Sequence, residues 1–251
     1  MKSTFKYTFS FCLLLCSFLV TAQKTIVKDS TVIKKDSIKP KTERYGLRLG
    51  VDLFKVSRSF YDKNYKGLEF VGDFKFSRKH YLAAEIGNEN KTVEDNQLNF
   101  TTKGTYFKVG FDYNSYENWL GMNNMLYVGM RYGASSFSQT LNNYSIYYAN
   151  NYFPKPIIES GEKFDGLSAQ WIEVIAGVKA EIYTNLYIGF SFRMNNLITN
   201  KVPENFDNLY IPGFNRTYGG NFGAGFNYTV SYFVPLYKTI LKNKVKEKSK
   251  K

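Results

Sequence analysis

Apolar side chains recur at every second position along most of the chain. The stretch KAEIYTNLYIGFSFRMNN, residues 179–196, shows this most clearly, with two alternating runs on either side of Tyr183-Thr184-Asn185. A period of two is typical of strands with one apolar and one polar face, and two such runs joined by a short turn form a hairpin. The same pattern recurs in eight segments: 44–54, 66–77, 80–88, 103–114, 124–135, 168–182, 185–195 and 219–236. Because no helical apolar stripe longer than two turns interrupts them, we expect an all-β, antiparallel domain.

The composition of the two strand faces indicates which one meets water. The apolar rows, such as Leu82-Ala84-Ile86, carry no charge, whereas the opposite rows carry both the charges and most of the glycines. Glycine weakens a strand by roughly 0.5–1 kcal/mol relative to alanine, and a solvated face has no need of it. The interior of a narrow barrel does need it, to make room for long side chains. The sequence therefore predicts a transmembrane β-barrel whose apolar rows face lipid and whose charges pair across the lumen. The predicted interior charges are Arg48, Asp52, Glu69, Asp73, Lys75, Glu85, Lys108, Asp112, Arg131, Glu173, Lys179, Glu181 and Arg193.

The lengths of the connections support an up-and-down barrel. The segments 55–65, 89–102, 136–167 and 196–218 are long, and they alternate with the shorter turns 78–79, 115–123 and 183–184. Outer-membrane barrels have long outer loops and short periplasmic turns. Eight strands are predicted, with both ends of the barrel domain in the periplasm; ten would form if residues around Ile146 made another pair. A soluble exported sandwich is the alternative, and it requires the apolar rows to pack face to face.

The N-terminal residues predict export. Lys2 and Lys6 precede an apolar stretch from Phe9 to Val20, and small residues lead to a cleavage site between Ala22 and Gln23. This is a secretory signal peptide; a lipoprotein signal using Cys16 is disfavoured by the large Leu15 before it. Both cysteines, Cys12 and Cys16, leave with the signal. We expect a signal peptide at 1–22, a basic periplasmic linker at 23–44, an outer-membrane barrel at 45–237 and a basic tail at 238–251.

The positive charge lies in the tails. Of 34 Lys and Arg and 21 Asp and Glu, residues 45–237 hold 18 basic and 17 acidic groups, so this part is almost neutral. Basic tails on an exported protein favour anionic lipid head groups or an acidic periplasmic protein partner over nucleic acid, although simple solvation of the tails fits equally well.

These features together resemble a known class of proteins. The signal peptide ending at Ala22-Gln23, eight alternating strands, a mature chain without cysteine and 18% aromatic residues are similar to the small outer-membrane barrels of Bacteroidota, including families labelled as domains of unknown function. Such barrels commonly end on an aromatic residue, whereas this chain continues past Tyr237 into KTILKNKVKEKSKK.

The chemistry of the mature chain argues against catalysis. Barrel hydrolases and acyltransferases of the resembled kind place a histidine near the outer rim, but the one histidine here, His80, adjoins the short turn 78–79. No enzyme, cofactor or metal site is therefore predicted. An eight-stranded lumen is just wide enough for side chains to fill, so a narrow pore is the less favoured alternative.

The longest loop is rich in tyrosine and asparagine. These residues combine large contact area with adaptable hydrogen bonding, as in binding surfaces. The candidate ligand-binding residues are Tyr144, Tyr147, Tyr148, Asn150, Asn151, Tyr152 and Phe153. A binding surface and a plain extension of the neighbouring strands fit equally well. The predicted function is a non-enzymatic integral outer-membrane protein with a structural or binding role in contact with outer-membrane lipid; the alternative is an accessory subunit of an envelope secretion or assembly complex, engaged through the basic tails.

Overall fold

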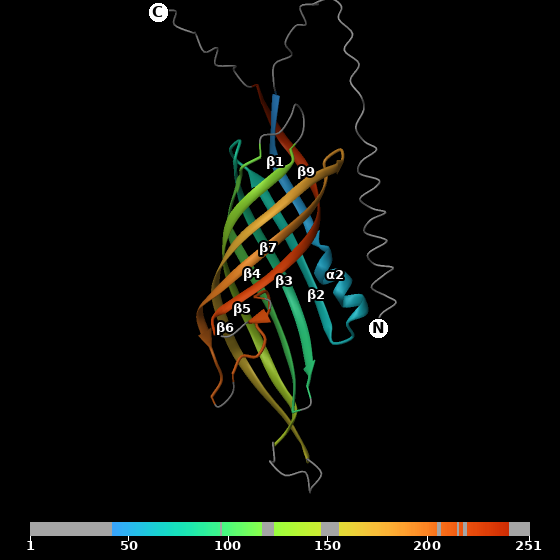
Figure 1. Cartoon of the computed structure of the whole chain (residues 1–251), viewed down its shortest axis with the longest axis vertical. Coiled ribbons are helices and arrows are strands. Elements are labelled where there is room, and N and C mark those ends of the chain that lie inside the picture. The colour runs from blue at the N-terminus through green and yellow to red at the C-terminus, as the bar shows by residue number, and fades with distance from the viewer. Residues whose placement is uncertain are drawn as a thin grey trace, which may run out of the picture. The chain divides into compact units, whose positions relative to one another are not determined.

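Eight long antiparallel strands form a closed barrel (Figure 1). The computed structural model describes residues 42–95, 97–116, 123–146, 156–204, 207–214, 216–217 and 220–240. The elements in chain order are β1 (Thr42–Asp52), α2 (Leu53–Tyr61), β2 (Tyr65–Lys75), β3 (His80–Glu94), β4 (Leu98–Asn114), β5 (Met125–Ser145), β6 (Ile157–Tyr183), β7 (Leu186–Lys201), β8 (Arg216–Thr217) and β9 (Phe222–Ile240). Each long strand pairs with the next one along the chain, and β1 pairs with β9 to close the ring.

The prediction of an eight-stranded up-and-down barrel is confirmed, but the strands are longer than expected. Most of the predicted loop 89–102 belongs to β3 and β4, which pair as far as Glu94 and Asn99. The predicted loop 136–167 is likewise shortened, because β5 and β6 pair up to Ser145 and Ile157. The residues up to Ser145 thus extend an existing strand, and in the part of the chain that the structure describes the barrel has eight long strands, not ten. β8, only two residues long, adds to the edge of β9.

The two faces of the barrel have the predicted composition. Large apolar side chains point outward and are exposed, among them Phe107, Phe111 and Val128. Glycines of the opposite face make room inside: a Cβ at Gly133 would collide with the ring of Trp171, and one at Gly129 would collide with Asp112. An exposed apolar belt around a charged interior is the arrangement of a transmembrane barrel, and it excludes the soluble sandwich. Within the described ranges, no helix is long and apolar enough to cross a membrane.

The helix α2 corrects the expected secondary structure, which continued the first strand to residue 54. The strand ends at Asp52, whose side chain caps the helix by accepting a hydrogen bond from the Phe54 backbone nitrogen at 2.8 Å. Leu53, Val56 and Phe60 have helical spacing, but the helix is only nine residues long. A helix this short has too few apolar positions to be recognised from sequence periodicity. Leu53 also continued the alternating row of β1, which favoured a strand.

This helix occupies a place in the barrel wall where strand pairing stops. β1 pairs with β2 only from Leu47 to Val51, so the rest of β2 faces α2 instead of a strand (Figure 1). The Ser59 hydroxyl accepts a hydrogen bond from the Gly67 backbone nitrogen at 2.8 Å and thereby satisfies part of the open edge of β2. On the other side, the Phe54 ring packs on Phe226 and Tyr228 of β9, at centroid distances of 5.0 and 5.7 Å. The helix thus joins β2 to β9 through side chains.

The two ends of the barrel differ. The turn end carries the β2–β3, β4–β5 and β6–β7 connections, and there Thr42 of β1 pairs with Ile240 of β9. The loop end carries α2, the β3–β4 and β5–β6 hairpins and the β7–β9 connection, and the β5–β6 hairpin extends farthest (Figure 1). Register shifts in this hairpin coincide with Gly161 and Gly166, both at φ +67°, which are β-bulges that coil it.

Candidate functional site

The predicted interior charges meet inside the barrel. Eleven of the thirteen are buried, and Lys179 and Glu181 are partly buried. In the middle of the lumen, Arg193 contacts Glu85 at 2.6 Å and Glu173 at 3.1 Å, and Lys108 contacts Glu173 at 3.0 Å. Such pairing is what permits charges to be buried, since an unpaired charge would be strongly destabilising.

Further ion pairs lie on both sides of this group. Asp73 accepts from Lys179 at 2.6 Å and lies 3.4 Å from Arg48, while Arg131 contacts Asp112 at 2.8 Å. Toward the turn end, Lys75 pairs with Glu43 at 3.2 Å and Glu181 with Arg44 at 3.5 Å. Glu43 was assigned from the sequence to the linker, but it belongs to β1, as does Arg44, where the first strand was predicted to begin.

The predicted ligand-binding residues of the longest loop are only partly visible. Tyr144 lies in β5, where it pairs with Leu98 and Ile158. Tyr147, Tyr148, Asn150, Asn151, Tyr152 and Phe153 lie outside the described residues.

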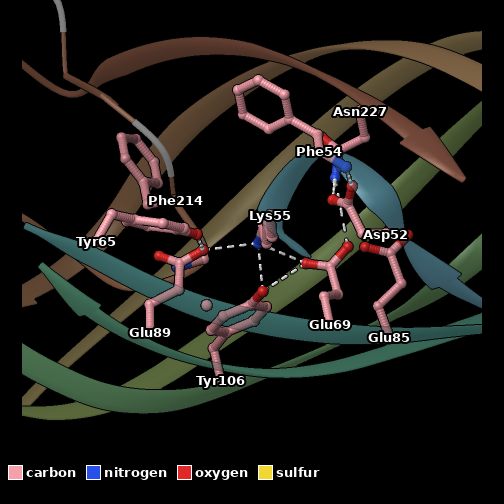
Figure 2. Close-up of polar contacts among 12 residues, drawn as sticks. Asp52, Phe54, Lys55, Tyr65, Glu69, Glu85, Glu89, Tyr106, Phe214 and Asn227 are labelled. Atoms are coloured by element: carbon pink, nitrogen blue, oxygen red, sulfur yellow. Dashed lines mark hydrogen bonds and ion pairs between the residues drawn. The ribbon is translucent and has the colours of Figure 1, made fainter. Parts of the chain in front are cut away.

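A second polar group, at the loop end, centres on Lys55 of α2 (Figure 2). We call Lys55, Glu69, Glu89 and Tyr106 the lysine cluster. The Lys55 ammonium lies 2.7 Å from Glu69 of β2 and 2.8 Å from Glu89 of β3, and it also donates to the Tyr106 hydroxyl. Tyr106 in turn donates to Glu69 at 2.5 Å. Lys55 is 2% exposed, so both carboxylates hold its charge in a site shielded from water.

The lysine cluster is tied to the element before α2 and to the neighbouring strands. Asn227 of β9 donates to Asp52, the residue that caps α2, and lies 3.4 Å from Glu69. The Tyr65 hydroxyl donates to Glu89 at 3.1 Å (Figure 2). The helix is therefore anchored on both sides of the wall segment that it occupies.

The β7–β9 connection folds into the same end of the lumen, and we call its residues 207–214 the plug. The Tyr210 hydroxyl and the Gly213 backbone nitrogen both donate to Glu89, at 2.6 and 3.1 Å. Burial, reinforced by the Glu89 carboxylate, holds the pKa of Tyr210 well above its ordinary value, so the phenol remains a donor. Glu89 thus joins the plug to the helix.

Below these contacts the plug supplies an apolar filling. Phe214 is fully buried, with its ring edge-on to Trp171 at a centroid distance of 5.7 Å. The Phe214 backbone oxygen also accepts a hydrogen bond from Asn195 at 2.5 Å. The filling consists of Tyr106, Phe137, Leu167, Ala169, Trp171, Leu197, Ile211 and Phe214. The lumen thus has a charged middle and an apolar outer section closed by the plug.

Sequence reasoning missed Lys55, Glu89, Tyr210 and Phe214. Glu89 could have been found, because it lies two residues after Gly87 and four after Glu85, on the same inward face of β3. The predicted strand had only to be continued past residue 88. Lys55 required recognition of the helix. Tyr210 and Phe214 lie in a connection without periodicity, so no sequence signal placed them in the lumen.

The remaining chemistry is sparse in the described part of the chain. The ring of His80, at the turn end, packs near Phe76 and Tyr113, with centroids 6.0 and 5.4 Å away. No group of three or more His, Cys, Asp or Glu side chains among the described residues is arranged to hold a metal ion.

Comparison with known proteins places the chain in a family. Among solved structures it is similar to Ail, the attachment invasion locus protein of Yersinia pestis, with 11% identity, coverage of 80% of this chain and 100% of that one, and a TM-score of 0.38. No curated protein matches the sequence. A family model described as "Domain of unknown function (DUF6048)" matches residues 4–239, nearly the whole chain. The chain therefore belongs to the DUF6048 family, and the barrel described above is its architecture in this member.

Proposed function

We propose that the protein is a non-enzymatic integral barrel of the outer membrane that binds a partner through the β5–β6 hairpin. The observation that carries this proposal is the height of the hairpin above the apolar belt. The belt ends near Ala134, because Ser136 begins a polar row with Ser168, its partner on β6. From there the two strands stay paired to Ser145 and Ile157. At about 3.3 Å per residue, β5 continues roughly 30 Å along its own direction beyond the belt.

The composition of this hairpin supports a binding role. Most of the β6 residues from 157 to 166 are exposed, so this part of the hairpin is not held in a core. The tyrosine and asparagine residues from 144 to 153 form its tip in the sequence. Tyrosine provides a large, rigid contact area with little loss of conformational entropy, and asparagine adapts its hydrogen bonds.

The filling of the barrel supports a binding or structural role over transport. Paired charges occupy the middle of the lumen, and the plug packs against Trp171 above them. An eight-stranded barrel has room for little else. The orientation follows from the same rule as in known outer-membrane barrels, with the loop end at the cell surface and the turn end in the periplasm.

A second function is favoured by one observation at the turn end. Thr42 and Ile240 are paired neighbours, so the two basic segments of the sequence are attached to the barrel at adjacent points. Two basic segments at one point could jointly engage an acidic periplasmic protein, as an accessory subunit of an envelope complex would.

Photo-crosslinking in living cells tests both functions. A crosslinking amino acid at Tyr148 is expected to give a discrete protein or glycan adduct, whereas one at Tyr183, the last residue of β6 at the turn end, is expected to give none. Adducts from position 246 alone would replace the hairpin proposal with the tail-mediated one. Absence of adducts from every position in 144–153, while the unboiled protein keeps its faster gel mobility, would refute hairpin binding. Conductance steps from the purified barrel would refute the filled lumen.

A further inference from the structure

The outer wall of the barrel is hollowed where small side chains replace large ones in the lipid-facing rows. Gly72 of β2 pairs with Ala84 of β3 in one such row. Closer to the loop end, Ser136 of β5 pairs with Thr105 of β4 and with Ser168 of β6. Because cross-strand partners lie side by side on one face, each set forms a shallow floor between larger neighbours.

These floors belong to three hollows that follow one another toward the loop end, which we call the outer-wall groove. The first, of ≈ 530 Å³, lies over Gly72 and Ala84. The second, also ≈ 530 Å³, lies over Ala134 and Ser136. The third, of ≈ 570 Å³, lies above Ser136. The first two share Phe70, Ile86 and Phe107, and the last two share Asn88, Thr105 and Ser136, so each hollow adjoins the next.

The lining changes from apolar to charged along the groove. The first hollow is bordered by Leu47, Leu49 and Phe74. The second is lined by Leu68, Phe70 and Phe107 and also by the polar Gln170. The third is lined by Lys103, Lys163 and Asp165, together with asparagine and hydroxyl side chains. This is the order of a lipid molecule in one leaflet, with acyl chains in the hydrocarbon layer, a polar junction and a head group outside.

The charges of the third hollow favour an anionic head group. Lys103 is exposed and points outward beside Asn90 and Ser138, its partners on β3 and β5. Lys163 contacts Asp165 at 2.9 Å, but their side chains are 58% and 63% exposed, and such a pair is worth little in water. Two ammonium groups against one carboxylate leave a net positive rim where a lipid phosphate would lie.

We propose that the outer-wall groove is a binding site for an anionic, acyl-chain lipid of the leaflet at the loop end. The acyl chains lie over Gly72, Ala84 and Ala134, and the phosphate is held by Lys103 and Lys163. The proposal does not depend on the β5–β6 hairpin binding a partner, because the hairpin residues that line the groove, such as Lys163 and Asp165 of β6, lie away from the residues 144–153.

The experiment measures lipid binding by native mass spectrometry of the full-length mature protein in mild detergent. Phosphatidylglycerol and phosphatidylcholine serve as probes, with inorganic phosphate as a competitor. Phosphatidylglycerol is expected to bind at least about tenfold more tightly than phosphatidylcholine, in keeping with the attraction of one or two lysines. Inorganic phosphate is expected not to displace it, because the acyl chains contribute to binding.

Two variants and two matched controls locate the site. Ser136→Phe fills the groove floor, and Lys103→Glu reverses the rim charge; each is expected to weaken phosphatidylglycerol binding roughly tenfold. Ala176→Phe places the same ring on an outward position of β6 away from the groove, and Lys63→Glu reverses an exposed charge beyond α2; both are expected to bind as the parent does. Unboiled gel mobility verifies that each variant is folded. Equal binding of the two lipids, or equal losses in variants and controls, would overturn the proposal.

Discussion

Replacing Lys55 by methionine tests whether the lysine cluster holds the barrel wall together. The change removes the cation that lies 2.7 Å from Glu69 and 2.8 Å from Glu89 while keeping a side chain of similar length. The lysine side chain is 3% exposed and the two carboxylates 0% and 1%, so water can replace the lost partner only if the wall opens. Removing one partner of such a buried pair costs about 3–5 kcal/mol of stability. At about 1.36 kcal/mol per tenfold change, the unfolding equilibrium constant should rise roughly 10²- to 10⁴-fold.

The assay is urea unfolding of the protein refolded into lipid vesicles, followed by tryptophan fluorescence, with Trp171 as a buried reporter. Lys163→Met is the control, because its exposed pair with Asp165 is worth about 0–1 kcal/mol. The triple variant Lys55→Met, Glu69→Gln, Glu89→Gln should regain more than half of the loss, since it no longer buries unpaired charges. A Lys55→Met protein within about 1 kcal/mol of the parent, or a triple variant no better than the single one, would show that the cluster does not hold the wall.

Four further changes test other parts of the structure. Tyr210→Phe removes a donor to the buried Glu89, a hydrogen bond worth about 1.5–3 kcal/mol, and should increase protease cleavage within 207–214, whereas Tyr232→Phe, on the lipid face, should not. Ser59→Ala leaves the Gly67 nitrogen without its acceptor and should speed amide exchange at Gly67, and Ser59→Thr should preserve protection; equal exchange in both would contradict the edge contact. Gly166→Ala strains a backbone at φ +67° by roughly 1–2 kcal/mol and should loosen the β5–β6 hairpin in hydrogen exchange without shifting the unfolding of the barrel. Partial burial raises the pKa of Asp62, but hydrogen bonds from Lys91, Asn64 and Arg58 outweigh it and hold that pKa below its ordinary value. The ionised Asp62 therefore stabilises the fold above the ordinary carboxyl pKa, and this stabilisation is lost as the pH falls through the lowered pKa. Asp62→Asn should abolish that part of the pH dependence of unfolding.

The strands could be predicted because two different surroundings act on alternate residues. Lipid on one side and a charged lumen on the other force a period of two, so Arg48, Glu85 and Arg193 marked the inner face without any knowledge of their partners. The limits of the barrel were placed at 45 and 237, yet the strands pair from Thr42 to Ile240, because a strand edge continues wherever a neighbour offers hydrogen bonds.

The parts that sequence reasoning could not predict depend on contacts between distant segments. Lys55 and Glu69 are brought together by a helix of nine residues whose first residue, Leu53, continued the apolar row of the preceding strand. Phe214 enters the lumen because Trp171 and Asn195 receive it there, and neither is near it in the chain. Such packing produces no periodic pattern of apolar residues in the sequence of the plug.

The short contact between β1 and β2 gives the barrel a seam. Their ladder runs only from Leu47 to Val51, whereas the β3–β4 ladder runs from His80 to Glu94. Beyond Val51 the cylinder is held shut by the Ser59 hydroxyl, the ring of Phe54 and the charge of Lys55, all of which belong to a single helix. Local opening follows the weakest cooperative unit of a fold. In this barrel we expect that unit to be the side-chain contacts of α2 along the seam, because the wall there has no β1–β2 backbone ladder to break.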